Sequence, residues 1–255
     1  MNNPLKQFMH LAALTTLAPI VNAEQDALSY RTSMTIADSY WTRPGFFAPD
    51  KEGPVIQPEL NVTFSGKQGA VSGYIWENQN LAYGIGADGA HEIDIGISYT
   101  SRPFFEAGNF SAGLGLHGAW WEFGVAKILG KSHGILEPGI WIKQKINEKL
   151  SLESKLSSVK LLGDEGRDGF MVDHSATLRY SLGKRASVAL SYGMMYLDGS
   201  GIYGSEAGAA YLRGSLPVQY DFGNGINASL GIRFQKGFHD KPTGIGGFLT
   251  LEKRF

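Results

Sequence analysis

The chain has 255 residues, enough for one sizeable β-domain or two small ones. Its 23 basic and 24 acidic residues give a net charge of −1, which excludes a general attraction to nucleic acid or to an anionic surface. Cysteine is absent, so a disulfide framework, a thiolate zinc site and a cysteine nucleophile are excluded. The 34 glycines and the 12% of aromatic residues, with few charges, are typical of an all-β chain.

The first residues have the pattern of an export signal. Lys6 lies in a short polar start, Leu11 to Val21 is largely apolar, and Val21-Asn22-Ala23 precedes Glu24. We expect a signal peptide over residues 1–23, cleaved after Ala23, and a single domain over 24–255. An N-terminal anchor helix is the alternative, but the apolar run is too short to span a bilayer.

The rest of the chain alternates between apolar and polar residues instead of forming long apolar runs. Between Val172 and Leu182, for example, Leu178 and Tyr180 alternate with Asp173 and Arg179. Each alternating segment extends over about ten residues, the length that a tilted membrane strand needs. Strands of a soluble β-sandwich or lipocalin-like barrel, the main alternative, are nearer five or six residues long.

Turn residues divide the chain into about twelve strands. Short connections, such as Gly66–Gly69 and Gly223–Gly225, alternate with long ones, such as Asp38–Pro54. The expected strands lie near 28–37, 56–65, 70–77, 91–100, 110–121, 135–146, 150–161, 171–182, 186–196, 208–221, 226–236 and 246–255. An even number of strands, with short turns on one side, predicts a closed antiparallel transmembrane β-barrel. Such a multi-pass barrel belongs in the outer membrane, and both termini are expected on the periplasmic side.

Two features predict contact with a membrane and with the machinery that inserts barrels into it. Leu249, Leu251 and the terminal Phe255 share a face, which resembles the C-terminal signal of outer-membrane barrels, although Lys253 departs from it. We therefore expect recognition by the barrel-assembly machinery through Phe255. Aromatic residues near strand ends suggest two girdles against lipid and lipopolysaccharide: Phe64, Tyr99, Tyr180, Tyr220 and Phe255 near short turns, and Trp76, Trp120, Trp121 and Tyr196 near long loops.

If the apolar residues face lipid, the alternate residues face the lumen. The expected pore-lining bases are Arg31, Lys143, Lys145, Lys155, Arg179, Arg213 and Arg233, with Arg254 at the end of the chain. The expected acids are Glu59, Glu92, Asp94, Glu153 and Asp173, with Glu252. The bases come mostly from later strands than the acids, which predicts an acidic wall facing a basic one, and their excess of eight to six favours anions weakly. Alternatively, the charges pair across neighbouring strands and fill the lumen.

The longest expected loop carries Trp41, Phe46 and Phe47. Exposed aromatic residues on a long loop suggest either a constriction that folds into the barrel or a contact surface.

No catalytic motif is present, and we assign no catalytic residue, metal site or cofactor. Asp173, His174 and Ser175 are adjacent, but neighbouring strand residues point to opposite faces, so the three cannot form a triad by themselves. His91, His117, His133 and His239 stand singly near loop ends. Glu92 and Asp94 share a face, about 7 Å apart along a strand, and suit either lumen charge or a pair of Ca²⁺ ligands.

Part of the N-terminal third resembles the TorF family of porins. The similar residues are Ser39-Tyr40-Trp41-Thr42-Arg43, Pro54–Gln57, Gly73–Asn78 and Glu92–Gly96, within Ser39 to Tyr99. Tyr40-Trp41 departs from that family's usual aromatic pattern, and the rest of the chain matches only as a barrel. The resemblance implies an outer-membrane location and pore activity, with no substrate and no catalytic residues.

The favoured interpretation is an outer-membrane channel for passive diffusion of small polar or anionic solutes, without nucleic acid as a partner. A barrel enzyme acting on lipid or peptide at the outer rim, or a plugged barrel acting as an adhesin or structural protein, are the alternatives. Glycine and alanine on the outer face leave room for oligomers.

Overall fold

A computed structural model describes residues 27–41, 47–81, 91–124, 133–162, 170–198, 207–238 and 243–255. The expected signal peptide, residues 1–23, lies outside these ranges. The described residues form thirteen strands: β1 (Ala27–Trp41), β2 (Phe47–Gly66), β3 (Gly69–Asn80), β4 (His91–Ser101), β5 (Phe105–Ala107), β6 (Phe110–Gly124), β7 (His133–Lys145), β8 (Leu150–Leu162), β9 (Phe170–Ser181), β10 (Ala186–Asp198), β11 (Ala207–Gly223), β12 (Ile226–Gly237) and β13 (Gly244–Arg254). They contain no helix long and apolar enough to cross a bilayer.

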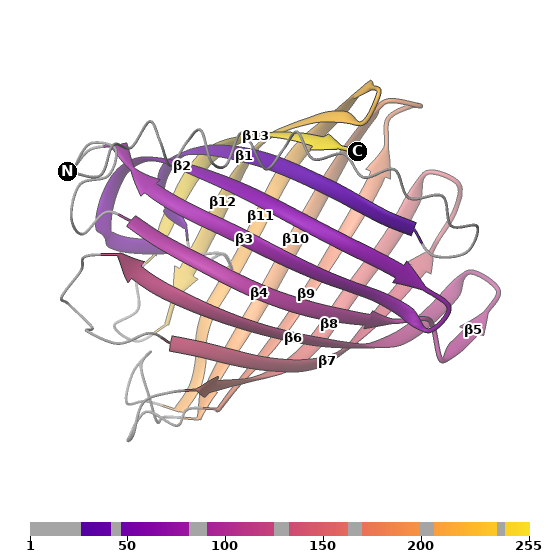
Figure 1. Cartoon of the computed structure of the whole chain (residues 1–255), viewed down its shortest axis with the longest axis horizontal. Coiled ribbons are helices and arrows are strands. Elements are labelled where there is room, and N and C mark those ends of the chain that lie inside the picture. The colour runs from indigo at the N-terminus through magenta and orange to yellow at the C-terminus, as the bar shows by residue number, and fades with distance from the viewer. Residues whose placement is uncertain are drawn as a thin grey trace.

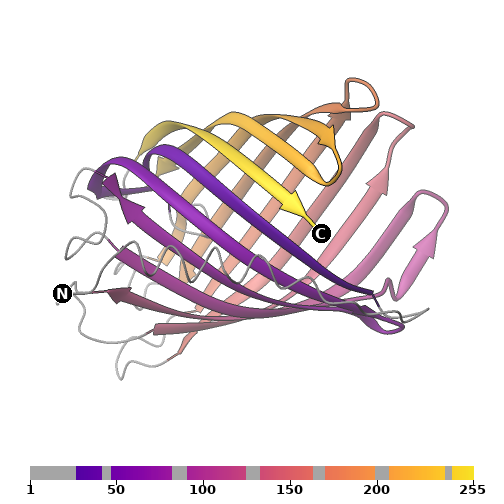
Figure 2. The same ribbon diagram turned by 45° about the horizontal axis from the view of Figure 1, so that its top comes forward.

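Twelve of these strands close into one antiparallel barrel (Figure 1). Each long strand pairs with its neighbour in sequence, β4 pairs with β6, and the last strand β13 pairs with the first strand β1. Figure 2 shows β13 in yellow lying beside β1 in indigo. The closed antiparallel barrel of twelve strands is therefore confirmed. The thirteenth strand, β5, is a three-residue addition to the short connection between β4 and β6, and it pairs only with β6.

Alternation within each strand separates two faces of the sheet. On β10, Ala189 and Met195 are buried, whereas the residues that directly follow them, Leu190 and Tyr196, are exposed. The buried set points into the barrel and the exposed apolar set points outward. Large apolar side chains are exposed on most strands, and a surface of this kind is stable only against hydrocarbon or another apolar surface.

The short turns lie together at one end of the barrel, which we call the short-turn end. At the β11–β12 turn, Gly223, Asn224 and Gly225 have φ angles of 85°, 51° and 74°. This left-handed backbone suits glycine and asparagine. A Cβ on Gly225 would lie 2.4 Å from the carbonyl oxygen of Arg254, so the turn also needs glycine for space.

The opposite end, which we call the long-loop end, differs from expectation in two respects. First, β1 and β2 continue into the segment expected to be a loop, and Trp41 pairs with Phe47. Register shifts after Ala37 and Ser39 accommodate this extension. Trp41 and Phe47 therefore lie on strands and not on a loop, while Phe46 lies outside the described residues.

Second, Trp76 is not part of an outer aromatic girdle. It stands opposite Glu59 of β2, on the inward face, and only 5% of it is exposed. Val71 and Ile75 on the same strand are exposed and face outward. Because adjacent strand residues face opposite sides, Trp76 next to Ile75 faces inward, so nearness to a strand end was a misleading criterion.

The C-terminal strand completes the closure. The backbone N–H of Phe255 donates to the carbonyl of Tyr30 at 2.9 Å, and the Phe255 ring is exposed on the outer surface. The ammonium group of Lys253, which departs from the expected apolar pattern, reaches the turn and donates to the carbonyl of Asn224. A long side chain can thus stand on an apolar face while its charge leaves the hydrocarbon.

The two faces predict opposite responses to an added charge. Ile232 faces outward in the middle of β12, and Ser229 faces inward on the same strand. We expect Ile232→Arg to lower the free energy of unfolding by about 2–4 kcal/mol, the cost of a cation in the bilayer interior. Ser229→Arg should change it by less than about 1 kcal/mol, because its side chain enters the lumen. Denaturant unfolding in phospholipid vesicles measures both values, and equal losses would contradict the assignment of faces.

Candidate pore interior

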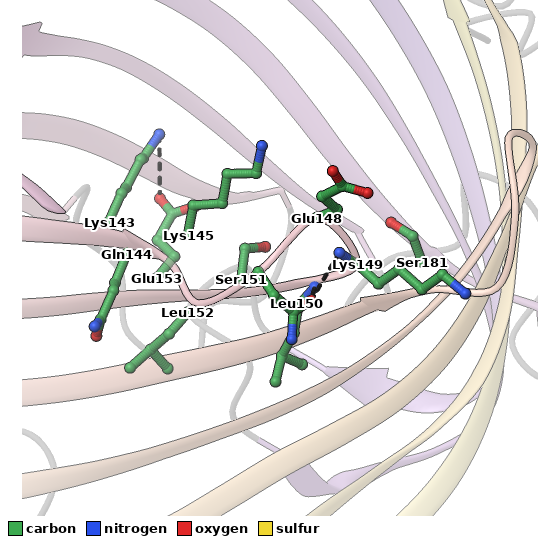
Figure 3. A pocket seen from close by; sticks show the side chains of 11 residues that line it. Lys143, Gln144, Lys145, Glu148, Lys149, Leu150, Ser151, Leu152, Glu153 and Ser181 are labelled. Carbon is green, nitrogen blue, oxygen red and sulfur yellow. Dashed lines mark hydrogen bonds and ion pairs between the residues drawn. The ribbon is translucent and has the colours of Figure 1, made fainter. Parts of the chain in front are cut away.

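The expected pore-lining residues lie at those alternate positions of their strands whose side chains face the inside of the barrel. Register pairs join inward residues to one another, as for Lys143 with Glu153, Arg213 with Gln235, and Asp94 with Trp76. Figure 3 shows Lys143 and Lys145 pointing to one side of β7, while Gln144 points to the other. The lumen of the described barrel is therefore densely charged.

One charged contact in the lumen joins Arg213 of β11 to Asp173 of β9. One guanidinium nitrogen lies 2.8 Å and 2.7 Å from the two carboxylate oxygens. The strand between them, β10, carries Gly193 at this point, and the Arg213 side chain lies against it. A side chain at position 193 would occupy the space through which the arginine reaches its partner.

A second group of charges lies where β1 meets its neighbours. Arg31 donates to Glu59 of β2 at 2.5 Å and to Glu252 of β13 at 3.5 Å. Glu252 also accepts from Arg254 at 2.7 Å. The seam that closes the barrel is thus bridged by two arginines and two glutamates.

A third group centres on Glu137 of β7, which was missing from the expected acids. Its carboxylate contacts His117 of β6 at 3.0 Å, and it accepts from Lys155 and Ser157 of β8, both at 2.7 Å. The other ring nitrogen of His117 lies 3.0 Å from the hydroxyl of Tyr74 on β3. Glu137 is separated from Lys143 and Lys145 by an even number of residues on the same strand, and this spacing would have placed it on the inward face.

This group corrects the expectation that His117 stands alone. The ring of His117 also stacks against Tyr74, with centroids 5.8 Å apart. Tyr74 in turn covers Gly96 of β4, where a Cβ would lie 2.2 Å from its ring. The glycine therefore allows the tyrosine to lie flat across β4 and reach the histidine.

Three further bases, Lys143, Lys145 and Arg179, line the short-turn end of the lumen. Lys143 lies 3.6 Å from Glu153, and Arg179 donates to Gln219 of β11. Lys145 makes no ion pair with any residue that the structure describes. The side chains of Lys143 and Glu153 are 55% and 60% exposed, and they border an open recess of about 340 Å³ (Figure 3). We call the inward residues Lys143, Lys145, Ser151, Glu153 and Arg179 the basic vestibule.

The long-loop end of the lumen is packed instead. Two clusters of buried apolar side chains, both in contact with Ala119, follow the inner wall at this level. We call them, with Ala119, the apolar ring: Ile135, Val159, Met171, Met195, Leu197, Ala210 and Tyr211 in one cluster, and Ala37, Val55, Tyr74, Trp76 and Phe248 in the other. The exposed fraction of the inward residues therefore falls from the short-turn end to the long-loop end, from more than half at Lys143 to 0% at Val55.

Polar side chains interrupt the apolar ring on several strands. On β4, Glu92 and Asp94 are 4% and 6% exposed, and Asn78 of β3 lies opposite Glu92. On β12, Gln235 is 1% exposed, and Arg233 lies with its guanidinium 4.3 Å from the centre of the Phe248 ring. The described residues contain no group of three histidine, aspartate or glutamate side chains that could hold a metal ion.

The expected separation into an acidic and a basic wall is not what the contacts show. Four of the seven expected bases, namely Arg31, Lys143, Lys155 and Arg213, form ion pairs with an acid on a nearby strand. The alternative of local pairing therefore describes these four bases. Three of the acids that they bind, Glu59, Glu137 and Asp173, are each 13% exposed, and a buried charge is stable only beside a partner.

No family model matches the chain, and no curated protein matches it. Among solved structures it is similar to the NanC porin, with a TM-score of 0.60 and 8% identity over 89% of this chain and 99% of that one. It is also similar to an outer membrane channel from Pseudomonas putida F1, with a TM-score of 0.57 and 10% identity over 93% and 100%. The KdgM porin gives 0.54 and 9% over 89% and 99%. The fold is therefore that of outer-membrane barrels, whereas the TorF resemblance gains no support and stays a prediction.

The Arg213–Asp173 pair predicts a non-additive effect on stability. Arg213→Met leaves the carboxylate of Asp173, which is only 13% exposed, without its strongest partner. We expect this variant to lose about 3–5 kcal/mol of unfolding free energy. The double variant Arg213→Met/Asp173→Leu should recover most of the loss, because no buried charge remains. A double-mutant cycle in detergent micelles measures the coupling, and additive losses would show that the pair is not a unit.

Proposed function

We propose that the protein is an outer-membrane channel for passive diffusion of small polar solutes. The observation that carries this proposal is the gradient along the lumen, from the exposed basic vestibule to the apolar ring. A barrel whose interior served only as a structural core would be packed along its whole length. Here the short-turn half is polar, charged and open, which is the surface that an aqueous passage needs.

The solute preference follows from the vestibule. Lys143 pairs with Glu153 there, and Lys145 and Arg179 flank Ser151, which leaves an excess of positive charge in the vestibule. Rings of basic side chains attract anions into a pore. We therefore propose small polar solutes with a weak preference for anions.

The apolar ring is the proposed barrier to flow. Hydrophobic constrictions close a pore by expelling water, without needing a solid plug. In the ring, Glu92 and Asp94 on β4 and Arg233 on β12 offer polar sites beside the apolar wall. Opening requires a movement of side chains at this level, not a rearrangement of the strands.

The proposal includes an orientation. Short turns of outer-membrane barrels lie on the periplasmic side, and here Ala27 and Phe255 lie at the short-turn end. The vestibule would then open to the periplasm and the apolar ring would lie near the outer surface. The outward aromatic residues would contact lipid and lipopolysaccharide, and Phe255 would be available to the assembly machinery.

Charge reversal at the vestibule tests the solute preference. We expect single-channel steps from purified protein in planar bilayers, with a modest preference for chloride over potassium. Lys143→Glu with Lys145→Glu should shift the reversal potential under a salt gradient towards cation preference, because the excess charge at the mouth changes sign. Lys149→Glu in the nearby turn is a control with a smaller expected shift. A bilayer that stays sealed at all voltages for the wild-type and for the opened variant below would refute the channel.

Trimming the apolar ring tests the barrier. Met195 and Leu197 are 3% and 8% exposed and lie on the inward face of β10. Met195→Ala with Leu197→Ala should raise conductance or open probability several-fold, because a wider and less apolar constriction holds water more readily. Leu190→Ala on the outward face of the same strand is the matched control and should leave conductance unchanged. Unchanged conductance in the ring variant would place the barrier elsewhere.

A further inference from the structure

The outer face of the barrel carries a hydrogen-bonded polar cluster that the channel does not use. On β9, His174 points outward, one ring nitrogen lies 3.1 Å from the hydroxyl of Ser154 on β8, and the other lies 3.3 Å from the hydroxyl of Tyr192 on β10. The rings of His174 and Tyr192 also meet edge to face, with centroids 5.5 Å apart. We call these three residues the outer polar cluster.

The position of the cluster is unusual for polar groups. Ser154 and Tyr192 flank Ala176 in the register, and the histidine reaches both across this small residue. Ala176 is four residues from Tyr180, and Tyr192 is four residues from Tyr196, the exposed aromatic residues nearest each end of these strands. Four residues of a tilted strand correspond to about 10 Å of depth, so the cluster lies near the middle of an apolar band about 25 Å tall.

The charged side chains on the described outward face lie close to the water. Each is within three residues of a strand end: Asp38, Glu77, Lys160, Lys236 and Lys253. The outer polar cluster instead stands among Leu156, Leu178 and Leu190, which are 50%, 37% and 52% exposed. Polar groups at this depth are costly unless another protein surface covers them.

Hydrogen-bond capacity shows that the cluster is incomplete by itself. A neutral imidazole has one N–H donor and one acceptor nitrogen. One of the two hydroxyls therefore donates to His174, and the other accepts from it and keeps its own hydrogen. Within the described part of the chain, neither Ser154 nor Tyr192 has a second partner. One O–H donor is left facing hydrocarbon, which offers no acceptor.

We propose that this face of β8, β9 and β10 is the contact between two copies of the chain in the membrane, centred on the outer polar cluster. The cluster carries both a spare donor and spare oxygen lone pairs, so a two-fold axis through it lets each copy satisfy the other. Ser154 and Ala176 are small, and small residues at a membrane interface allow backbones to approach closely. Lipid is the less suitable occupant, because its ester and phosphate oxygens lie at the interface and not at this depth.

A hydrolytic role for the same residues fits the geometry less well. Ser154 beside His174 resembles a nucleophile beside its base, but Tyr192 stands where hydrolases place a carboxylate or an amide. Water and ester bonds are also absent from the middle of a bilayer. The proposed contact does not depend on whether the lumen conducts.

Cross-linking tests the geometry of the contact. The chain has no cysteine, so a single introduced thiol reports on one position without interference. Leu156, opposite His174 in the register, is the test site, and Leu60 on β2 is the control. β2 is six strands from β9 in either direction around the barrel. We expect Leu156→Cys to form a disulfide-linked dimer in oxidised vesicles and Leu60→Cys to remain monomeric. No cross-link at Leu156, or equal cross-linking at both sites, would overturn the proposal.

Self-association of the full chain in detergent tests the role of the cluster. We expect His174→Leu to raise the dimer dissociation constant about ten-fold, which is the effect of losing one hydrogen bond between two proteins in a membrane. Thr32→Leu, an outward polar-to-apolar change on the opposite wall, should leave it unchanged. The heat-dependent gel shift of barrels verifies folding, which His174→Leu should not impair. A monomeric wild-type protein would overturn the proposal, as would a dimer that His174→Leu does not weaken.

Discussion

Hydrocarbon cannot pair with backbone N–H and C=O groups, and this constraint decides the architecture. A sheet satisfies it only by closing, so β13 must pair with β1. The register of that seam places Arg31 directly opposite Arg254, two like charges that would repel. Glu252 binds both arginines, and Glu59 binds Arg31 from the other side. Closure of the backbone is therefore supported by the side chains at the seam.

Closure gives the two faces of each strand different surroundings. The outer face meets one uniform medium and is almost uniformly apolar. The inner face passes from an open, charged mouth to a packed apolar ring. Lys145 at the exposed mouth has no ion-pair partner among the described residues, whereas Arg213 and Asp173 pair where burial removes water. The proposed channel combines these two regimes, because the wet half attracts solutes and the dry half limits their passage.

The outer polar cluster shows the same physics from the other side. His174, Ser154 and Tyr192 reduce the cost of placing polar groups in hydrocarbon by hydrogen-bonding to one another, but one of their O–H donors is left without an acceptor. Inside the barrel such a donor would meet water or a neighbouring strand. Outside, only another protein surface can supply the acceptor at that depth, which is why a second copy is the proposed occupant.

The amino-acid sequence by itself determined the twelve strands that form the barrel, its short turns and its closure, because alternation and turn chemistry are local properties, but it did not predict β5 or the extension of β1 and β2. It also placed Lys143, Arg213 and Asp173 on inward positions, and the same counting would have placed Glu137 and Trp76 there. Only the tertiary structure decided which side chains are in contact. Arg213 and Asp173 are 40 residues apart, and Tyr74 and His117 are 43 apart. Those contacts depend on register across several tilted strands and on glycines that open space between them, and no local pattern encodes either.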